Sequence, residues 1–352
     1  MKRRLSRTIT IGGVKIGGRA PVVVQSMTKT ATQDVVATVK QIKDLSNAGC
    51  ELVRLAVPDM EAASALREIK SQVSLPLVAD IHFDYRLALA AIENGADGLR
   101  LNPGNIRGKK QIQKIVAAAA SRAIPIRIGV NSGSLDRATL KKYGHPTPEA
   151  MVESALGHVR ILEDLDFHLI KISLKSPDVL RMVSAYRLLS ERVDYPLHLG
   201  VTEAGTLISG TVKNALGIGL LLSEGIGDTI RVSLTHDPVA EVKVAYEILR
   251  ALGLRQRGVE IISCPTCGRC QIGLLDLAEK IEDALNHITA PLKVAIMGCV
   301  VNGPGEAREA DVGIAGGRGQ GTLFRKGKVV KKVTESDLAR VLIAEVKKMA
   351  DE

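Results

Sequence analysis

Short runs rich in β-branched residues alternate with longer helical patterns along the first 250 residues, and this alternation constrains the fold more than any other feature. Eight such runs are predicted strands, at residues 21–27, 52–57, 77–81, 98–103, 126–131, 169–174, 197–202 and 229–234. Segments between them, such as 34–48 and 61–72, space apolar side chains three and four positions apart, as amphipathic helices require. Eight strand–helix units predict a (β/α)8 barrel, the TIM barrel. A doubly wound open sheet is the alternative.

The chain has 352 residues, which exceeds the roughly 250 residues of such a barrel. We expect the barrel to occupy residues 1–252, a short linker to occupy 253–258 and a smaller α+β domain to fill 259–352. The pattern at residues 8–18 predicts a small hairpin that covers the N-terminal end of the barrel. In the smaller domain the predicted elements are a helix over 275–286, a strand over 292–297 and a final helix over 335–349.

Composition excludes several classes of protein. Aromatic residues make up 2% of the chain and tryptophan is absent, which argues against nucleic-acid binding by base stacking. No apolar run is long enough for a membrane span or a secretion signal, so we expect a soluble, cytoplasmic protein without a membrane or nucleic-acid partner. The formal net charge of +10 favours anionic ligands or acidic protein partners.

Several predicted barrel strands carry a cation between apolar neighbours. These cations are Arg54, Arg100, Arg127, Lys171 and Arg231. Because side chains alternate faces along a strand, the apolar neighbours should face the helices and the cations should face the barrel interior. The same parity extends to Asn102, Asn131, Ser173, Lys175 and Ser233. Buried cations need counter-charges, and interior acids are scarce, so we expect the barrel to bind a strongly anionic substrate. Structural ion pairs are the alternative.

Two acids belong to the predicted barrel interior. Asp80 and His82 share one face at the end of the third strand, and Glu203 follows the seventh, where the catalytic groups of TIM barrels lie. Glu203 is therefore a candidate proton donor or acceptor. An acid stabilised by the dipole of a helix N-terminus is the alternative explanation. His198 and His236 are expected to be structural.

Four of the five cysteines lie close together near the start of the smaller domain. Cys264, Cys267 and Cys270 follow one another at C-x2-C spacing, and Cys299 comes later. In a chain without a secretion signal, such clustering favours metal binding or redox chemistry over disulfides. Zinc and iron–sulfur clusters both accept this spacing. The lack of a second C-x2-C or a histidine pair near Cys299 favours the cluster, with zinc or buried thiols as alternatives. Cys50 is expected in the core.

These motifs together resemble the bacterial 4-hydroxy-3-methylbut-2-enyl diphosphate synthase family. The resemblance covers nearly the whole chain and rests on SCPTCGR, GCVVNGPGEA, GVTEAG, LLSEGIGDTIRVSL, QSMT and ADIHFD. It implies a barrel similar to dihydropteroate synthase, followed by a reductase-like domain that holds a 4Fe-4S cluster. Members of the family reduce 2-C-methyl-D-erythritol 2,4-cyclodiphosphate with two electrons, opening its ring and expelling water. The reaction is the penultimate step of the methylerythritol phosphate route to isoprenoids.

The resemblance also implies roles for individual residues. The implied cluster ligands are Cys264, Cys267, Cys299 and Glu306, and Cys270 lies outside this set. The residues implied to bind the substrate are Arg54, Asp80, His82, Arg100, Arg127, Asn131, Lys175, Thr202, Arg231 and Ser233. Glu203 is implied to handle the proton during dehydration. Glu306 is implied to leave its iron more readily than a thiolate would, which frees that iron for a substrate oxygen.

Two protein partners are implied as well. Flavodoxin or ferredoxin, both acidic, supplies the electrons, which fits the basic chain. A second copy of the chain forms a head-to-tail homodimer, in which the cluster of one chain caps the barrel of the other. Two rival functions explain less. A pterin-binding or corrinoid-linked barrel leaves the cysteine motifs unexplained, and a zinc-binding RNA module conflicts with the arginines inside strands and the scarce aromatics.

Overall fold

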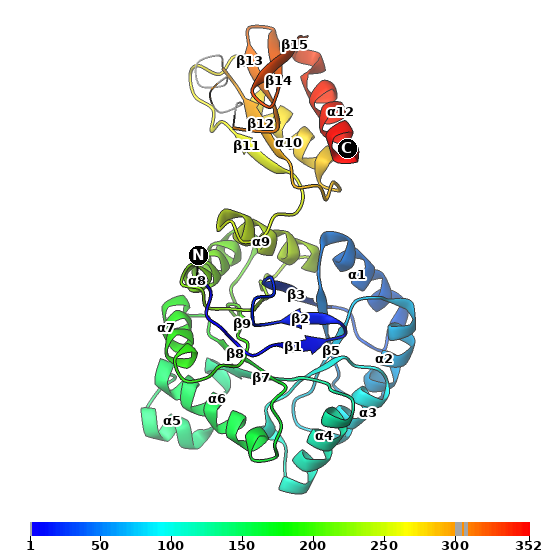
Figure 1. Ribbon diagram of the computed structural model, residues 1–352, viewed down its shortest axis with the longest axis vertical. Coiled ribbons are helices and arrows are strands. Elements are labelled where there is room, and N and C mark those ends of the chain that lie inside the picture. The colour runs from blue at the N-terminus through cyan, green and yellow to red at the C-terminus, as the bar shows by residue number, and fades with distance from the viewer. Residues whose placement is uncertain (1, 300–304, 306–308) are drawn as a thin grey trace. The chain divides into compact units, whose positions relative to one another are not determined.

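The computed structural model describes residues 2–299, 305 and 309–352, and it divides the chain into two compact units, Met1–Arg255 and Gln256–Glu352. The division falls inside the segment 253–258 that the sequence suggests as a linker. Each unit has its own sheet and its own hydrophobic core (Figure 1). Glu306, one of the implied cluster ligands, lies outside the described residues.

The first unit is a barrel of eight parallel strands, which confirms the predicted TIM barrel over the open sheet. The strands are β3 (Val23–Met27), β4 (Leu52–Ala56), β5 (Leu77–Asp80), β6 (Gly98–Arg100), β7 (Ile126–Asn131), β8 (Ile170–Lys175), β9 (His198–Leu199) and β10 (Thr229–Ile230). They pair in the order β8-β7-β6-β5-β4-β3-β10-β9. A parallel bridge between Ile172 of β8 and Leu197, just before β9, joins the two ends of this sheet and closes the ring. β9 and β10 are shorter than predicted.

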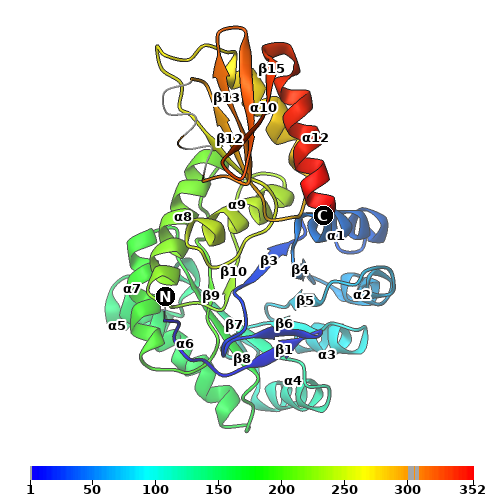
Figure 2. The same cartoon turned by 45° about the horizontal axis from the view of Figure 1, so that its top comes forward.

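Helices follow the strands and surround the barrel (Figures 1 and 2). They are α1 (Val35–Ala48), α2 (Met60–Gln72), α3 (Tyr85–Glu93), α4 (Lys109–Ser121), α5 (Arg137–Tyr143), α6 (Pro148–Glu163), α7 (Val179–Ser190), α8 (Leu207–Ser223) and α9 (Pro238–Ala251). Many begin at an aspartate whose carboxylate accepts a backbone N–H of the first turn, as Asp34, Asp59 and Asp178 do. The sequence did not predict α5. Among the described helices, none has the length and hydrophobicity of a membrane span.

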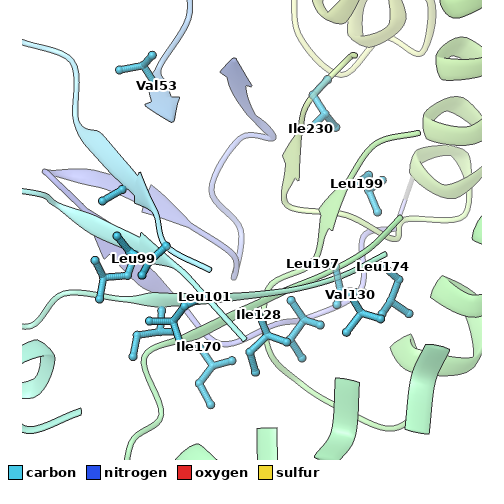
Figure 3. Close-up of a cluster of buried hydrophobic side chains, with 14 of the residues drawn as sticks. Val53, Leu99, Leu101, Ile128, Val130, Ile170, Leu174, Leu197, Leu199 and Ile230 are labelled. Carbon is cyan, nitrogen blue, oxygen red and sulfur yellow. The ribbon is translucent and has the colours of Figure 1, made fainter. Parts of the chain in front are cut away.

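The apolar residues of the barrel strands pack outward against the helices, as their alternation predicts. One core joins strand residues such as Leu55, Ile128 and Leu174 to helix residues such as Ile42 and Leu66, all fully buried. Figure 3 shows Ile128 and Leu174 among the strand side chains of this layer. The opposite face of each strand is thereby left to the side chains of the barrel interior.

The predicted hairpin near the N-terminus is confirmed. β1 (Ile9–Ile11) and β2 (Val14–Ile16) pair in antiparallel fashion. Their buried isoleucines form a small core with Val23, Leu52 and Val78, which lie near the N-terminal ends of three barrel strands. The hairpin therefore closes the barrel at the end opposite its catalytic face.

The second unit is a mixed sheet with helices packed on it. Its strands, in sheet order, are β11 (Glu260–Ser263), β12 (Lys293–Met297), β13 (Val312–Gly317), β14 (Gln320–Arg325) and β15 (Lys328–Thr334). The first three are parallel, and β14 and β15 add an antiparallel meander. The predicted strand over 292–297 and the two predicted helices correspond to β12, α10 (Leu274–Leu285) and α12 (Leu338–Asp351). The other four strands were not predicted.

Candidate active site

Six cations extend from barrel strands on the face opposite the apolar core. They are Arg54 on β4, Arg100 on β6, Arg127 on β7, Lys171 and Lys175 on β8, and Arg231 directly after β10. Arg100, Arg127 and both lysines are buried, and Arg54 and Arg231 are half-buried. Such a concentration of positive charge is unfavourable unless acids or an anionic ligand compensate it.

Asp80 compensates one side of this cation set. Its carboxylate lies 3.2 Å from Nη1 of Arg100, 3.8 Å from Nε of Arg54 and 3.7 Å from Nε2 of His82. Although burial alone would raise the pKa of Asp80, the contacts with His82, Arg54 and Arg100 hold it well below its usual range. Burial lowers the pKa of Arg54 to about 10, and Asp80 opposes this shift. Asp80, on β5, therefore stays ionised and holds one arginine on each of the two flanking strands, β4 and β6.

An Asp80→Asn variant should be less stable than the natural protein, and its stability should depend less on pH in the acid range. Because the pKa of Asp80 is lower in the folded than in the unfolded chain, its stabilising effect is complete above the ordinary pKa of about 3.9 and is lost as the pH falls further. Removing one member of a buried ion pair costs about 3 kcal/mol at pH 7. Calorimetric unfolding at steps between pH 7 and pH 3 should show a shallower acid decline in the variant. Parallel curves for the two proteins would contradict the assignment.

Glu241, in the first turn of α9, compensates a second side of the barrel, and the sequence analysis missed it. This carboxylate is 2% exposed and accepts hydrogen bonds from the Ser26 hydroxyl at 3.1 Å and the Leu234 N–H at 3.0 Å. It lies 3.3 Å from Nζ of Lys29 and 3.8 Å from Nη2 of Arg231. Strand parity identifies interior acids on strands only, so it does not include an acid on a helix. The position of Glu241 in the first turn of the helix after the last barrel strand is the sequence feature that could have indicated its role.

We expect Glu241→Gln to strengthen anion binding at Arg231. The amide keeps the size of the side chain but removes the negative charge that Lys29 and Arg231 share, so both cations attract an anion more strongly and the affinity for inorganic pyrophosphate should rise about tenfold. Isothermal titration measures this change. Glu247→Gln, at an exposed acid of the same helix that pairs with Arg250 at 2.7 Å, is the matched control and should bind pyrophosphate normally. Equal binding by both variants would remove Glu241 from the site.

The sector formed by β7 and β8 has no such acid among the described residues. Nε and Nη2 of Arg127 and Nζ of Lys175 have no hydrogen-bond partner there, and Arg127 reaches only the Ser173 hydroxyl through Nη1. Burial and the neighbouring cations Arg54 and Arg100 lower the pKa of Arg127 well below its usual value. Burial and Arg231 do the same to Lys175. These donors are therefore available to an anion.

A glycine makes room for the two central guanidinium groups. A Cβ on Gly129 of β7 would lie 2.9 Å from Nε of Arg100 and 3.1 Å from Nη1 of Arg127. The carbonyl of Gly129 also accepts hydrogen bonds from Arg100 at 3.1 Å and from the Asn102 amide at 3.0 Å. The two arginines are thus packed against strand backbone and are held in place before any ligand binds.

Four predicted site residues form no hydrogen bond with Asp80 or Glu241 in the described part of the chain. Asn131 ends β7 and is half-buried, and the hydroxyl of Ser233 is buried without a partner among the described residues. Thr202 and Glu203 follow β9, with Thr202 half-buried and Glu203 exposed. Glu203 has a left-handed backbone with φ of 51°, which is costly for a residue other than glycine. Its carboxylate forms no hydrogen bond or ion pair with the described part of the chain.

The cysteines of the second unit begin where β11 and β12 end. These parallel strands pair through Ser263 and Ile296, so their C-terminal ends lie together. Cys264 follows β11 directly, and its N–H donates to the Ile296 carbonyl at 3.2 Å. Cys299 follows β12 by two residues and is buried. The two cysteines that are furthest apart in the motif are therefore brought to one edge of the sheet.

Cys267 and Cys270 differ in their surroundings. Cys267 is exposed, and the backbone N–H of Arg269 lowers the pKa of its thiol. Cys270 is half-buried, donates to the Ile272 carbonyl at 3.3 Å and packs against Gly298 beside the apolar core. Among the described residues, no three metal-binding side chains surround one point. The thiols of Cys264, Cys267 and Cys299 are nonetheless a soft donor set that suits iron or zinc.

Family models match almost the entire chain. A model described as the GcpE TIM-barrel domain matches residues 6–246, and one described as the GcpE protein C-terminal domain matches residues 260–348. The chain is 63% identical over 347 residues to a protein of Geobacter sulfurreducens, covering 99% of this chain and 98% of that protein. It is 60% identical over 348 residues to one of Thermodesulfovibrio yellowstonii, covering 99% and 100% respectively. Both relatives are named 4-hydroxy-3-methylbut-2-en-1-yl diphosphate synthase (flavodoxin).

Solved structures add evidence on the fold alone. Dihydropteroate synthase of Yersinia pestis superposes with a TM-score of 0.51 at 12% sequence identity, covering 70% of this chain and 97% of that structure. At such low identity the likeness supports the barrel architecture and carries no information on the substrate.

Proposed function

This chain belongs to the GcpE family, and from that premise we propose that it converts 2-C-methyl-D-erythritol 2,4-cyclodiphosphate into 4-hydroxy-3-methylbut-2-en-1-yl diphosphate. The reaction takes two electrons, breaks a ring C–O bond and expels one hydroxyl group as water. Flavodoxin supplies the electrons, as the names of the relatives state for those proteins. The protein is thus an oxidoreductase of isoprenoid biosynthesis.

The observation that best supports this function is the uneven distribution of charge in the barrel. Asp80 forms ion pairs with the arginines of β4 and β6, and Glu241 forms one with Arg231. By contrast, the cations on β7 and β8 form no ion pair with an acid among the described residues. The diphosphate therefore binds against Nε and Nη2 of Arg127 and Nζ of Lys175, which have no partner in the described part of the chain. Asn131 at the end of β7, Thr202 after β9, Ser233 after β10 and His82 after β5 contact the polar groups of the substrate.

Glu203 is the acid proposed to handle the proton. It follows a barrel strand, it is exposed, and its carboxylate is not engaged by the described residues. The strained backbone at this position holds the side chain in a conformation that an ordinary loop would not select. Glu203 donates the proton with which the substrate hydroxyl leaves as water.

The second unit is proposed to hold a 4Fe-4S cluster through Cys264, Cys267, Cys299 and Glu306. When bound, such a cluster would supply single electrons and a Lewis-acidic iron. The chain supports this assignment with cysteines at the ends of two adjacent parallel strands and a Cys267 thiol whose pKa is lowered. Cys270 lies outside the ligand set that the family resemblance implies, and its thiol donates to the Ile272 carbonyl.

The test of the function is an anaerobic assay of the purified protein. Iron, sulfide and zinc are measured first, and about four irons and four sulfides per chain are expected. Turnover of the cyclodiphosphate with chemically reduced flavodoxin should then yield the linear diphosphate, detected by mass spectrometry. One zinc per chain without sulfide, or an intact cluster without product, would reject the proposal.

The protein is further proposed to act as a head-to-tail homodimer, in which the cluster of one chain meets the barrel of the other. Its barrel and its cysteines belong to separate units of one chain, which is consistent with an active site shared between chains. An exposed apolar stripe on α8 supports self-association. The stripe consists of Ile208, Val212, Leu216 and Leu220, spaced four residues apart, with exposed fractions of 81%, 53%, 54% and 39%.

Leu216→Glu is expected to convert the dimer to monomers at micromolar concentration. A charge in the middle of an apolar interface is desolvated without a partner, which costs several kcal/mol. Size-exclusion chromatography with light scattering measures the mass. Val36→Glu, at an apolar residue on α1 that is 83% exposed, is the control and should leave the mass unchanged. If both variants are dimeric, α8 is not the interface.

A further inference from the structure

We propose that the barrel contains a second anion site, deeper than the one assigned to the substrate, which binds a small inorganic anion such as chloride through Lys171, His198 and Thr229. These residues belong to the adjacent strands β8, β9 and β10. Thr229 is the register partner of His198, and Lys171 precedes Ile172, which bridges to Leu197. Because all three share the parity of the interior cations, their side chains lie together inside the ring.

The polar atoms of these side chains are buried and unsatisfied. Lys171 and His198 are each 1% exposed and Thr229 is 0% exposed. Within the described part of the chain, Nζ of Lys171, both ring nitrogens of His198 and the hydroxyl of Thr229 have no hydrogen-bond partner. Buried polar groups are nearly always satisfied by protein, water or ligand, and an ammonium group is the costliest to leave alone. Three neighbouring donors without acceptors indicate an acceptor that comes from solution.

No acid in the described part of the chain supplies that acceptor. Burial and Arg127 lower the pKa of Lys171 well below its usual value, and Asp228 opposes this shift, but no ion pair within 4.0 Å joins Asp228 and Lys171 among the described residues. Asp228 is instead fixed by Arg3 at 3.1 Å, the Ser6 hydroxyl at 3.0 Å and the Leu197 N–H at 2.9 Å. These three bonds hold the Asp228 carboxylate in place.

The site is distinct from the substrate site in depth and in size. Lys171 lies four residues before Lys175 on the same face of β8, which is about 13 Å along a strand. The β1–β2 hairpin closes the barrel on that side with an apolar core. Burial and the nearby cations, chiefly Arg127, lower the pKa of His198, so its neutral ring offers one N–H donor. The pKa of Lys171 is lowered in the same way, and an anion bound beside it favours the protonated form. One amino group, one ring N–H and one hydroxyl, all buried, suit a monovalent ion better than a diphosphate.

Bromide provides a direct test in the unaltered protein. Crystals of the full chain are grown with inorganic pyrophosphate, which occupies the cations of the substrate site. They are then soaked in sodium bromide, and anomalous scattering is recorded at the bromine edge. A peak within hydrogen-bonding distance of Lys171 Nζ and the Thr229 hydroxyl is expected. Density for water alone at this place, or bromide only beside Arg127 and Lys175, would overturn the proposal.

Halide-dependent stability gives a second, independent readout. At bromide concentrations about nine times the dissociation constant, the folding equilibrium constant of the natural protein should rise about tenfold relative to sodium gluconate of equal ionic strength. Lys171→Met should unfold cooperatively but lose this dependence, whereas Lys175→Met should keep it and lose pyrophosphate binding. The same halide dependence in Lys171→Met would refute the deeper site. Pyrophosphate titration measures binding at the substrate site separately. The absence of a halide effect would therefore reject the deeper site without contradicting the proposed function.

Discussion

An Arg127→Met variant is expected to bind inorganic pyrophosphate at least a hundredfold more weakly than the natural protein, while its ligand-free form unfolds at an equal or higher temperature. Two donor atoms of Arg127 are buried and have no partner among the residues that the structure describes, and hydrogen bonds from a charged donor contribute about 1.5–3 kcal/mol each. Their loss therefore costs about 3 kcal/mol of binding or more, and 1.4 kcal/mol corresponds to a factor of ten. Without a ligand the same charge is uncompensated, so its removal costs the fold little.

Arg100→Met separates this effect from simple charge removal. Arg100 is buried like Arg127, but it pairs with Asp80 at 3.2 Å and donates to the Gly129 carbonyl. This variant should lose both affinity and stability, because Asp80 is left with fewer partners. Titration calorimetry and differential scanning calorimetry on both variants give the comparison. If the two variants lose stability equally, the β7–β8 sector is not the uncompensated one.

The second large effect is expected at Cys267. Cys267→Ala should lose most of the bound iron and sulfide after anaerobic purification and reduce turnover by at least a thousandfold, because a catalytic metal group must be both retained and positioned. Visible absorption, iron analysis and flavodoxin-dependent turnover measure the three consequences. Cobalt(II) titration of the metal-free protein adds a readout that does not depend on activity, since thiolate charge-transfer bands should weaken in the variant.

Cys270→Ala is the matched control in the same loop. Its thiol donates to the Ile272 carbonyl and contacts Gly298, so its removal should cost some packing and leave iron content and turnover close to those of the natural protein. A Cys270→Ala variant that loses the iron, beside a Cys267→Ala variant that retains it, would exchange the roles of the two cysteines.

Much of the barrel follows from the sequence because one physical rule fixes both its fold and its interior. Strand side chains alternate, so an arginine between two aliphatic residues must face away from the helices. Arg100 illustrates the rule, with Leu99 and Leu101 in the outer core and its own guanidinium beside Asp80. The hairpin over Ile9–Ile16 was predictable for the same reason, since its buried isoleucines alternate with polar residues.

Residues outside that rule were missed. Glu241 reaches the barrel interior from a helix, and only the tertiary structure places its carboxylate beside Lys29 and Arg231. The strands β13 to β15 lack an alternating pattern, because Gly316 and Gly317 end β13, Gly321 lies in β14, and β15 is an exposed edge strand rich in lysine. Glu306 was identified as a cluster ligand by family resemblance alone, and it lies outside the described residues.

The unbalanced charge at β7 and β8 also has a consequence for the lifetime of the protein in a cell. A fold that holds repelling cations without a ligand gains stability from the compound it acts on, by an amount that grows with the concentration of that compound. Proteases remove a chain in proportion to its unfolded fraction, so scarce substrate should shorten the half-life of the enzyme and abundant substrate should extend it. Proteolysis of the purified protein should therefore slow as pyrophosphate is added, and this protection should vanish in Arg127→Met. The supply of the cyclodiphosphate would then set how much enzyme persists, without any dedicated regulator.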